Sequence, residues 1–187
     1  MLKPVYKISI MKLLILSVSC FFLSITGRAH SAMLDSIPVN PADVESVSSI
    51  LTALYDVISG PAGQTRNWDR MRTLFAPEAR LIPTGKRMDG TYDHRVFNLE
   101  QYILNAKPYF EKEGFFEREI SRKTDQYGAV VQVFSTYESR LQAADTTPFT
   151  RGINSIQLWN DGKRWWILTV FWQGETADNP IPEKYLQ

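Results

Sequence analysis

The last strand of this chain, residues 163–175 with the sequence KRWWILTVFWQGE, is apolar on both of its faces. Successive residues of a strand point to opposite sides of the sheet, so a strand with one face in water alternates apolar and polar side chains. A regular strand here would have two faces, one with Trp165, Ile167, Thr169 and Phe171 and the other with Trp166, Leu168, Val170 and Trp172. The fold must therefore cover both faces of this strand.

Three helices are predicted before the long strands. The first has Asn40 as its N-cap and continues with apolar residues at helical spacing as far as the glycine and proline break at residues 60–64. A short second helix is expected within residues 66–75. The third begins after Asn98, which has a glutamine three residues later to complete a capping box, and ends at Gly114.

After the third helix the apolar period changes to two. A brief strand is expected at residues 77–85, before that helix. Four long strands are expected after it, at residues 115–126, 129–141, 149–160 and 164–174. Short connections join the long strands, and Asp161-Gly162 is a strong hairpin signal. This pattern predicts an antiparallel meander, and helices followed by strands indicate the α+β class.

The chain has 187 residues, of which 44% are hydrophobic and 12% aromatic, which is enough to bury the core of one domain. We expect a single domain at residues 40–175 and an extended, proline-containing tail at residues 176–187. Residues 1–32 hold four basic residues and no acid, so 17 basic and 20 acidic residues remain, a net charge of −3. This balance provides no positive surface for nucleic acid or an anionic membrane.

Residues 11–32, MKLLILSVSCFFLSITGRAHSA, have the pattern of a cleaved export signal. Lys12 is the basic start, an apolar stretch too short for a comfortable membrane span follows, and small residues lie at the end around Ala32. We therefore expect residues 1–32 to be a signal peptide with Met11 as its natural start. The protein would be exported, either to a periplasm or out of the cell, with no stable membrane insertion after cleavage. The alternative is an uncleaved N-terminal membrane anchor.

Cleavage near Ala32 would leave little metal-binding or thiol chemistry. The only cysteine, Cys20, and one of the two histidines, His30, lie before that point, so His94 would be the one histidine of the mature chain. Disulfides, thiolate catalysis and zinc sites built from cysteine or several histidines are then excluded. No glycine-rich phosphate loop or nucleophile motif is present either, and we expect neither a metal site nor a cofactor.

Three segments of the sequence resemble the nuclear transport factor 2-like (NTF2-like) superfamily, and its SnoaL-like bacterial branch in particular. They are NWDRMRTLFAPEARLIPTG at residues 67–85, FNLEQYI at residues 97–103, and TRGINSIQLWNDGKRWWILTVFWQGE at residues 150–175. The resemblance covers residues 43–175. It implies a cone-shaped α+β fold, in which N-terminal helices pack on a strongly curved, mainly antiparallel sheet and leave a pocket between helices and sheet.

The resemblance also implies how both faces of the last strand are covered. One face would line the core and pocket, and the outer face would pack against a second copy in a homodimer. The alternative is that the C-terminal tail covers the outer face within one chain. The expected pocket suits a small apolar or aromatic molecule, and its expected lining consists of aromatic and apolar side chains, although each of them is also an ordinary core residue. They are Tyr55, Trp68, Met71, Phe75, Tyr102, Phe110 and Phe171.

The catalytic patterns of the superfamily do not match this sequence residue by residue. His94, which follows Asp93 in TYDHRV, is one candidate base, although a loop histidine is more often only solvated. Glu138 and Arg151 on neighbouring strands are a second candidate, since an arginine and a carboxylate can polarise a substrate or activate water. The alternative for this pair is a structural cross-strand ion pair.

Three functions stay open on the sequence. The first is an exported protein that binds a small apolar or aromatic molecule in the pocket. The second is a cofactor-free lyase, isomerase or hydrolase acting on such a molecule, as the superfamily includes isomerases, dehydratases, cyclases and epoxide hydrolases. The third is a scaffold that meets another protein through its outer sheet face. A buried carboxylate or His94 facing the cavity would favour the enzyme, and a closed, wholly apolar interior would favour the interaction protein.

Overall fold

The computed structural model of the protein describes residues 37–187. The predicted signal peptide, its start at Met11 and its cleavage site lie outside these residues. Within residues 37–187, no helix is long and apolar enough to cross a membrane.

Helices α2 (Pro41–Val44) and α3 (Val47–Ile58) replace the single first helix that the sequence predicted. Asn40 caps α2 as expected, but a second cap at Ser46 separates the two helices. The Ser46 side chain accepts a hydrogen bond from the Ser49 N–H at 3.0 Å, and the Ser49 side chain accepts one from the Ser46 N–H at 2.9 Å. This reciprocal capping box satisfies the free N–H groups of a new helix start, so the chain turns there.

Helices α4 (Trp68–Leu74) and α5 (Leu99–Glu113) follow the predicted positions. The Asn98 side chain accepts from the Gln101 N–H at 2.9 Å, which is the predicted capping box. Gly114 ends α5 with φ of 76°, a conformation that favours glycine.

The sheet has six strands, and its four long strands agree with the predicted meander. In space the strands lie in the order β2-β1-β6-β5-β4-β3, with β1 and β6 parallel and the other neighbours antiparallel. Their bounds are Phe75–Lys86 for β1, Tyr92–His94 for β2, Phe116–Tyr127 for β3, Val130–Arg140 for β4, Thr150–Asn160 for β5 and Trp165–Gly174 for β6.

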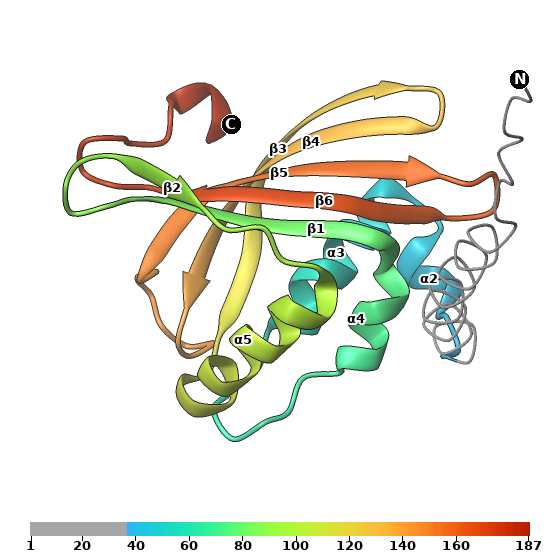
Figure 1. Cartoon of the computed structure of the whole chain (residues 1–187), viewed down its shortest axis with the longest axis horizontal. Coiled ribbons are helices and arrows are strands. Elements are labelled where there is room, and N and C mark those ends of the chain that lie inside the picture. Colours follow the sequence, from blue (N-terminus) through green and yellow to red (C-terminus); the bar gives the residue numbers. More distant parts are fainter. Residues whose placement is uncertain (1–36) are drawn as a thin grey trace, which may run out of the picture. The chain divides into compact units, whose positions relative to one another are not determined.

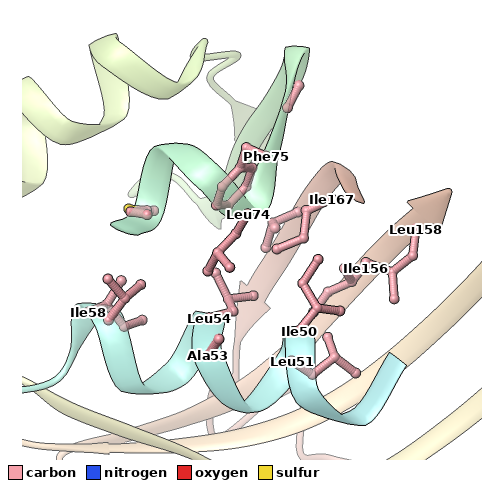
Figure 2. Close-up of a cluster of buried hydrophobic side chains, with 14 of the residues drawn as sticks. Ile50, Leu51, Ala53, Leu54, Ile58, Leu74, Phe75, Ile156, Leu158 and Ile167 are labelled. Atoms are coloured by element: carbon pink, nitrogen blue, oxygen red, sulfur yellow. The ribbon is translucent and has the colours of Figure 1, made fainter. Parts of the chain in front are cut away.

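The helices lie on one face of the curved sheet, which we call the inner face, and the short 3-10 helix η2 (Glu183–Tyr185) lies on the other side (Figure 1). The core is between α3 and the inner face. In Figure 2, Ile50 and Leu54 of α3 point toward Phe75 and toward Ile167 of β6, and all four side chains are buried. The predicted α+β architecture, with helices packed on a curved, mainly antiparallel sheet, is confirmed.

A β-bulge in β6 changes which of its residues face the core. Ile167 pairs with Leu158 and Thr169 pairs with Gln157, so Leu168 is an extra residue without its own partner on β5. An extra residue reverses the alternation of side chains beyond it. The regular two-face division expected from the sequence is therefore wrong after the bulge. The inner face carries Trp165, Ile167, Val170 and Trp172, and the outer face carries Trp166, Thr169, Phe171 and Gln173.

The outer face of the sheet is covered in part by the chain itself. The Thr136 hydroxyl of β4 donates to the Tyr185 carbonyl at 2.6 Å, and the rings of Phe134 and Tyr185 lie 5.5 Å apart. At the other end of the sheet, the Arg164 guanidinium lies 3.7 Å from the centre of the Trp166 ring. The tail thus covers β4, and Arg164 covers one tryptophan of β6, but the outer side of Phe171 stays 45% exposed.

Candidate functional site

A cavity of about 260 Å³ lies between helices α3, α4 and α5 and the inner face of the sheet. Most of its wall is apolar, with side chains that include Leu54, Met71, Leu81, Phe110, Val170 and Trp172. Its polar lining consists of Glu117, Tyr102, Tyr137 and Asn154. A mostly apolar cavity with a few convergent polar groups is the usual composition of a small-molecule site.

Glu117 is the one carboxylate that lines this cavity. It is the second residue of β3, and its pairing with Ser139 places both side chains on the inner face. The Ser139 hydroxyl donates to the Glu117 carboxylate at 2.8 Å, and Asn154 lies with Glu117 in the cavity lining. Ser139 and Asn154 favour the charged carboxylate, but burial outweighs them and raises the pKa of Glu117 to about 7. The carboxyl group is therefore ready to give or take a proton near neutral pH.

Two tyrosines face the cavity beside Glu117. The ring of Tyr102 meets the ring of Trp172 edge to face at 6.2 Å, which fixes its position. Burial, together with the nearby charge of Glu117, raises the pKa of both Tyr102 and Tyr137 far above its ordinary value, so both hydroxyls stay neutral. Neither hydroxyl makes a hydrogen bond within the described part of the chain, and each is free to donate one to a bound molecule.

A glycine on β5 makes room for Tyr137. A Cβ atom at Gly152 would lie 2.5 Å from the Tyr137 hydroxyl and 2.4 Å from the carbonyl oxygen of Gln173. Only glycine allows the tyrosine to lie across the strand at this distance. The position of the hydroxyl in the cavity thus depends on the missing side chain of Gly152.

Behind the cavity wall, a row of buried hydrogen bonds continues from Asn154 into the core. The Asn154 amide donates to the Tyr55 hydroxyl at 3.0 Å, and the Tyr55 and Ser135 hydroxyls lie 2.6 Å apart. Ser135 in turn donates to Glu119, which forms an ion pair with Arg122 at 2.6 Å. These polar groups are satisfied by one another, as buried polar groups in native proteins generally are.

The structure brings together only part of the pocket lining expected from the sequence. Met71, Tyr102 and Phe110 line the cavity, and Tyr55 supports it from behind through Asn154. The other three expected residues lie elsewhere. Trp68 and Phe75 are buried in the core beside the cavity, and Phe171 is on the outer face because of the bulge in β6.

The three catalytic candidates from the sequence lie away from the cavity. His94 is exposed on β2, at the outer face. Glu138 and Arg151 are cross-strand neighbours on β4 and β5, as expected, but each has other partners. Arg151 binds Glu175 at 2.8 and 3.0 Å, and Glu138 accepts from two other arginines. The structure thus gives Glu138 and Arg151 separate ion pairs.

Sequence reasoning missed Glu117 and the role of Asn154. One weak signal for Glu117 was its position two residues after Phe115, on the same side of the chain, where β3 begins. The next residues on this side, Glu119, Ser121 and Lys123, are polar, so the pattern does not indicate an apolar face there. Asn154 gave no signal in the sequence, because its role depends on Tyr55, Glu117 and Tyr137, which come from three other elements and meet it only in the folded protein.

A second hollow, of about 620 Å³, lies on the outer face over β1, β2, β5 and β6. It is open to solvent, and Phe171, Ile82 and Val96 form its apolar part. His94 lies at its rim with Asp93, whose carboxylate binds Arg87. Within residues 37–187 there is no cluster of three histidine, cysteine or acidic side chains that could hold a metal ion.

No protein-family model matches the chain, and no curated protein does. Solved structures match it at low identity. A protein of unknown function with a cystatin-like fold from Nostoc punctiforme is 8% identical, with a TM-score of 0.51 over 70% of this chain and 90% of that one. An NTF2-like protein of unknown function from Shewanella baltica is 10% identical, with a TM-score of 0.45 over 70% and 91%. A protein with a ketosteroid isomerase-like fold from Catenulispora acidiphila is 17% identical, with a TM-score of 0.42 over 72% and 90%.

Identities this low show the fold alone and say nothing about activity. The chain has the α+β fold that the sequence predicted, and a match with a TM-score above 0.5 is the protein with a cystatin-like fold.

Proposed function

We propose that the protein binds a small, largely apolar molecule in the inner cavity and that Glu117 transfers a proton to or from this molecule without a cofactor. The observation that carries the proposal is the single carboxyl group in a mostly apolar wall, with its pKa raised to about 7. A general acid or base works best when its pKa is near the working pH. A carboxylate that faces the cavity favours the enzyme over the passive binding protein.

The neighbours of Glu117 suggest the kind of molecule. Tyr102 and Tyr137 offer two neutral hydroxyl donors, which suit a carbonyl or hydroxyl oxygen of the ligand. Proton transfer next to an oxygen held in this way is the chemistry of isomerases and lyases. The cavity volume of about 260 Å³ limits the ligand to one or two small rings.

Acetophenone, an aromatic ketone with exchangeable methyl protons, tests this proposal. We expect saturation-transfer NMR to show that it binds, and we expect the protein to accelerate deuterium incorporation into its methyl group in D₂O. Glu117→Gln should keep binding but lose the acceleration by about a hundredfold or more, the usual contribution of general acid–base catalysis.

Two variants at alanines locate the binding site. Ala106→Phe fills the cavity and should weaken binding by more than about tenfold through overpacking. Ala144→Phe, in an exposed loop, is the matched control and should bind as the wild type does. Binding that is equal in Ala106→Phe and the wild type would contradict the site. Bound acetophenone without accelerated exchange would contradict proton transfer.

A second proposal is that two copies associate through the outer face. The exposed centre of this face carries Ile82, Thr169, Phe171, Ser155 and Gln157, with no charged side chain among them. Interface cores are poor in charge and rich in aromatic residues, and a twofold interface sets each patch against its own copy. The tail covers only the neighbouring part of the face, over β4.

Native mass spectrometry tests this association. We expect a dimer for the wild type and a monomer for Phe171→Glu, which would place two carboxylates in a buried interface. Phe149→Glu is the matched control, since Phe149 is similarly exposed, at 50%, but belongs to another surface, and this variant should stay dimeric. A monomeric wild type would contradict the proposal.

We also propose that the protein is exported, to a periplasm or out of the cell, after loss of residues 1–32. The support is the sequence pattern around Lys12 and Ala32. A cofactor-free site with one carboxylate would need no component that is restricted to the cytoplasm.

A further inference from the structure

A row of hydrogen bonds leads from Asn154, which shares the cavity lining with Glu117, into the core and ends at an ion pair. Its members are Asn154, Tyr55, Ser135 and Glu119, which come from α3, β3, β4 and β5. Tyr55, Ser135 and Asn154 are 6%, 0% and 5% exposed, so bulk water has little access to replace a lost partner.

The direction of every hydrogen bond in this row follows from the charged carboxylate of Glu119 at its inner end. Glu119 is ion-paired with Arg122, and a charged carboxylate can only accept, so the Ser135 hydroxyl must donate to it. Having used its proton, Ser135 accepts from Tyr55, and the Tyr55 oxygen is left to accept from the Asn154 amide. The Ser135 and Tyr55 hydroxyls each have one proton to donate, and the Asn154 amide has one donor end. No other set of directions gives every donor in the row an acceptor.

This direction determines which end of the Asn154 side chain faces the cavity. The amide nitrogen must lie toward Tyr55, and this end of the amide then carries the N–H that favours the charged form of Glu117 in the same cavity lining. We propose that Tyr55, Ser135 and Glu119 are positioning residues, which hold the Asn154 amide with its N–H toward Glu117 and so set how readily this carboxyl group gives up its proton. The inference deepens the proposed function, on which it rests, by naming what regulates its proton-transfer group.

The other groups around Glu117 do not provide the same control. The titratable side chains facing it are Tyr55 from α3, Tyr102 from α5 and Tyr137 from β4, and burial keeps all three neutral. From α4 and β6 the cavity lining is apolar. Among residues 37–187, Ser139 is the one side chain that donates a hydrogen bond to the carboxylate. The orientation of one amide therefore has a large influence on its protonation.

Ser135→Ala is the sharpest test of this proposal. Without Ser135, the Tyr55 hydroxyl loses its acceptor, and we expect the Asn154 amide to turn so that its oxygen accepts from Tyr55 instead. The oxygen would then face Glu117 in place of the N–H, which favours the protonated carboxyl group. We expect the midpoint of the Glu117 titration, followed by NMR of ¹³C-labelled glutamate carboxyl groups, to rise by about one pH unit.

Thr136→Val is the matched control, because it removes a buried hydroxyl from the next residue of the same strand on the opposite face. It should cost similar stability and leave the titration of Glu117 unchanged. Tyr55→Phe, which removes the middle of the row, should shift the midpoint in the same direction as Ser135→Ala. An unshifted midpoint in Ser135→Ala, or an equal shift in Thr136→Val, would overturn the proposal.

The titration keeps this proposal separate from the proposed function. It requires no ligand, so the wild type and its variants can be compared even if acetophenone is neither bound nor exchanged. A shifted midpoint without turnover would support the positioning row and contradict the proton-transfer function. Normal turnover with an unshifted midpoint would support the proton-transfer function and contradict the positioning row.

Discussion

Glu117→Gln is expected to be more stable than the wild type by about 3 kcal/mol at about pH 8, and nearly equal to it at about pH 4. Glutamine keeps the size and the hydrogen-bonding capacity of the side chain but carries no charge. The wild type must hold an ionised carboxylate in an apolar cavity at high pH, and the variant does not. Substitution of a functional residue often raises the free energy of unfolding, because functional sites are held at a cost in stability.

The sign follows from the two pKa values of Glu117. Its ordinary value, which applies to the unfolded chain, is 4.5, and burial raises the value in the folded state to about 7. Between these values the folded state binds more protons than the unfolded state, so the free energy of unfolding falls as the pH rises. Below the lower value both states are protonated, and above the higher value both are ionised. The loss is therefore complete only above about pH 7.

Urea unfolding of wild type and variant at a series of pH values measures this difference. Glu78→Gln, on the exposed part of β1, is the control for a change from glutamate to glutamine as such. We expect the two curves of Glu117→Gln and wild type to diverge between the two pKa values and then run parallel. A difference that is constant across the whole series would contradict a buried, late-titrating carboxyl group.

Arg66→Ala is expected to lower the free energy of unfolding by about 4 kcal/mol, one of the largest effects of any single substitution in this chain. Arg66 is 4% exposed, and its guanidinium group donates hydrogen bonds to five backbone carbonyls. These belong to Ile58, Gly60, Pro61, Gln64 and Phe110. Alanine would leave several of these buried acceptors without a donor, which costs more than the hydrogen bonds themselves contribute.

The same arginine supports the end of the cavity. It joins the last turn of α3 to Phe110 near the end of α5, and Ile58 and Phe110 both line the cavity. Its guanidinium also lies 5.9 Å from the centre of the Phe110 ring. We therefore expect Arg66→Ala to reduce acetophenone binding in addition to stability. Arg66→Lys should recover little, since an ammonium group cannot reproduce the planar fork of donors.

Arg95→Ala provides the control for Arg66. Arg95 is exposed, and its guanidinium lies over the Phe97 ring at 5.6 Å, but its side chain makes no hydrogen bond within the described residues. Chemical unfolding should show a loss of less than about 1 kcal/mol for this variant. Equal losses for the two arginine variants would show that the carbonyl contacts of Arg66 contribute little.

The elements of the fold were predictable where local chemistry determines them. The capping box of Asn98 and Gln101, the turn at Gly162 and the four long strands all depend on residues close in sequence. The division of the first helix at Ser46 uses the same chemistry and was missed, because Val44 and Val47 continue the helical spacing of apolar residues across this serine, although serine favours N-caps. The parallel pairing of β1 with β6 joins distant segments, and no local pattern indicates it.

The candidate site was harder to predict, for two physical reasons. One is the bulge at Leu168, which exchanges the faces of Phe171 and Trp172 and has no signature in a run of apolar residues. The other is that the polar group of the cavity is defined by its surroundings. Glu117 differs from other glutamates of the chain only because Ser139, Asn154 and an apolar wall enclose it, and these come together in the folded state.

The titration of Glu117 in the unmodified protein is the most direct test of this account. The carboxyl carbon of Glu117, assigned by its absence in Glu117→Gln, would be followed by ¹³C NMR as the pH is varied. We expect a midpoint at about 7, as burial in the mostly apolar cavity raises the pKa of this carboxyl group. A midpoint close to the ordinary value of 4.5 would show a solvated carboxylate and would contradict the proposed role in proton transfer.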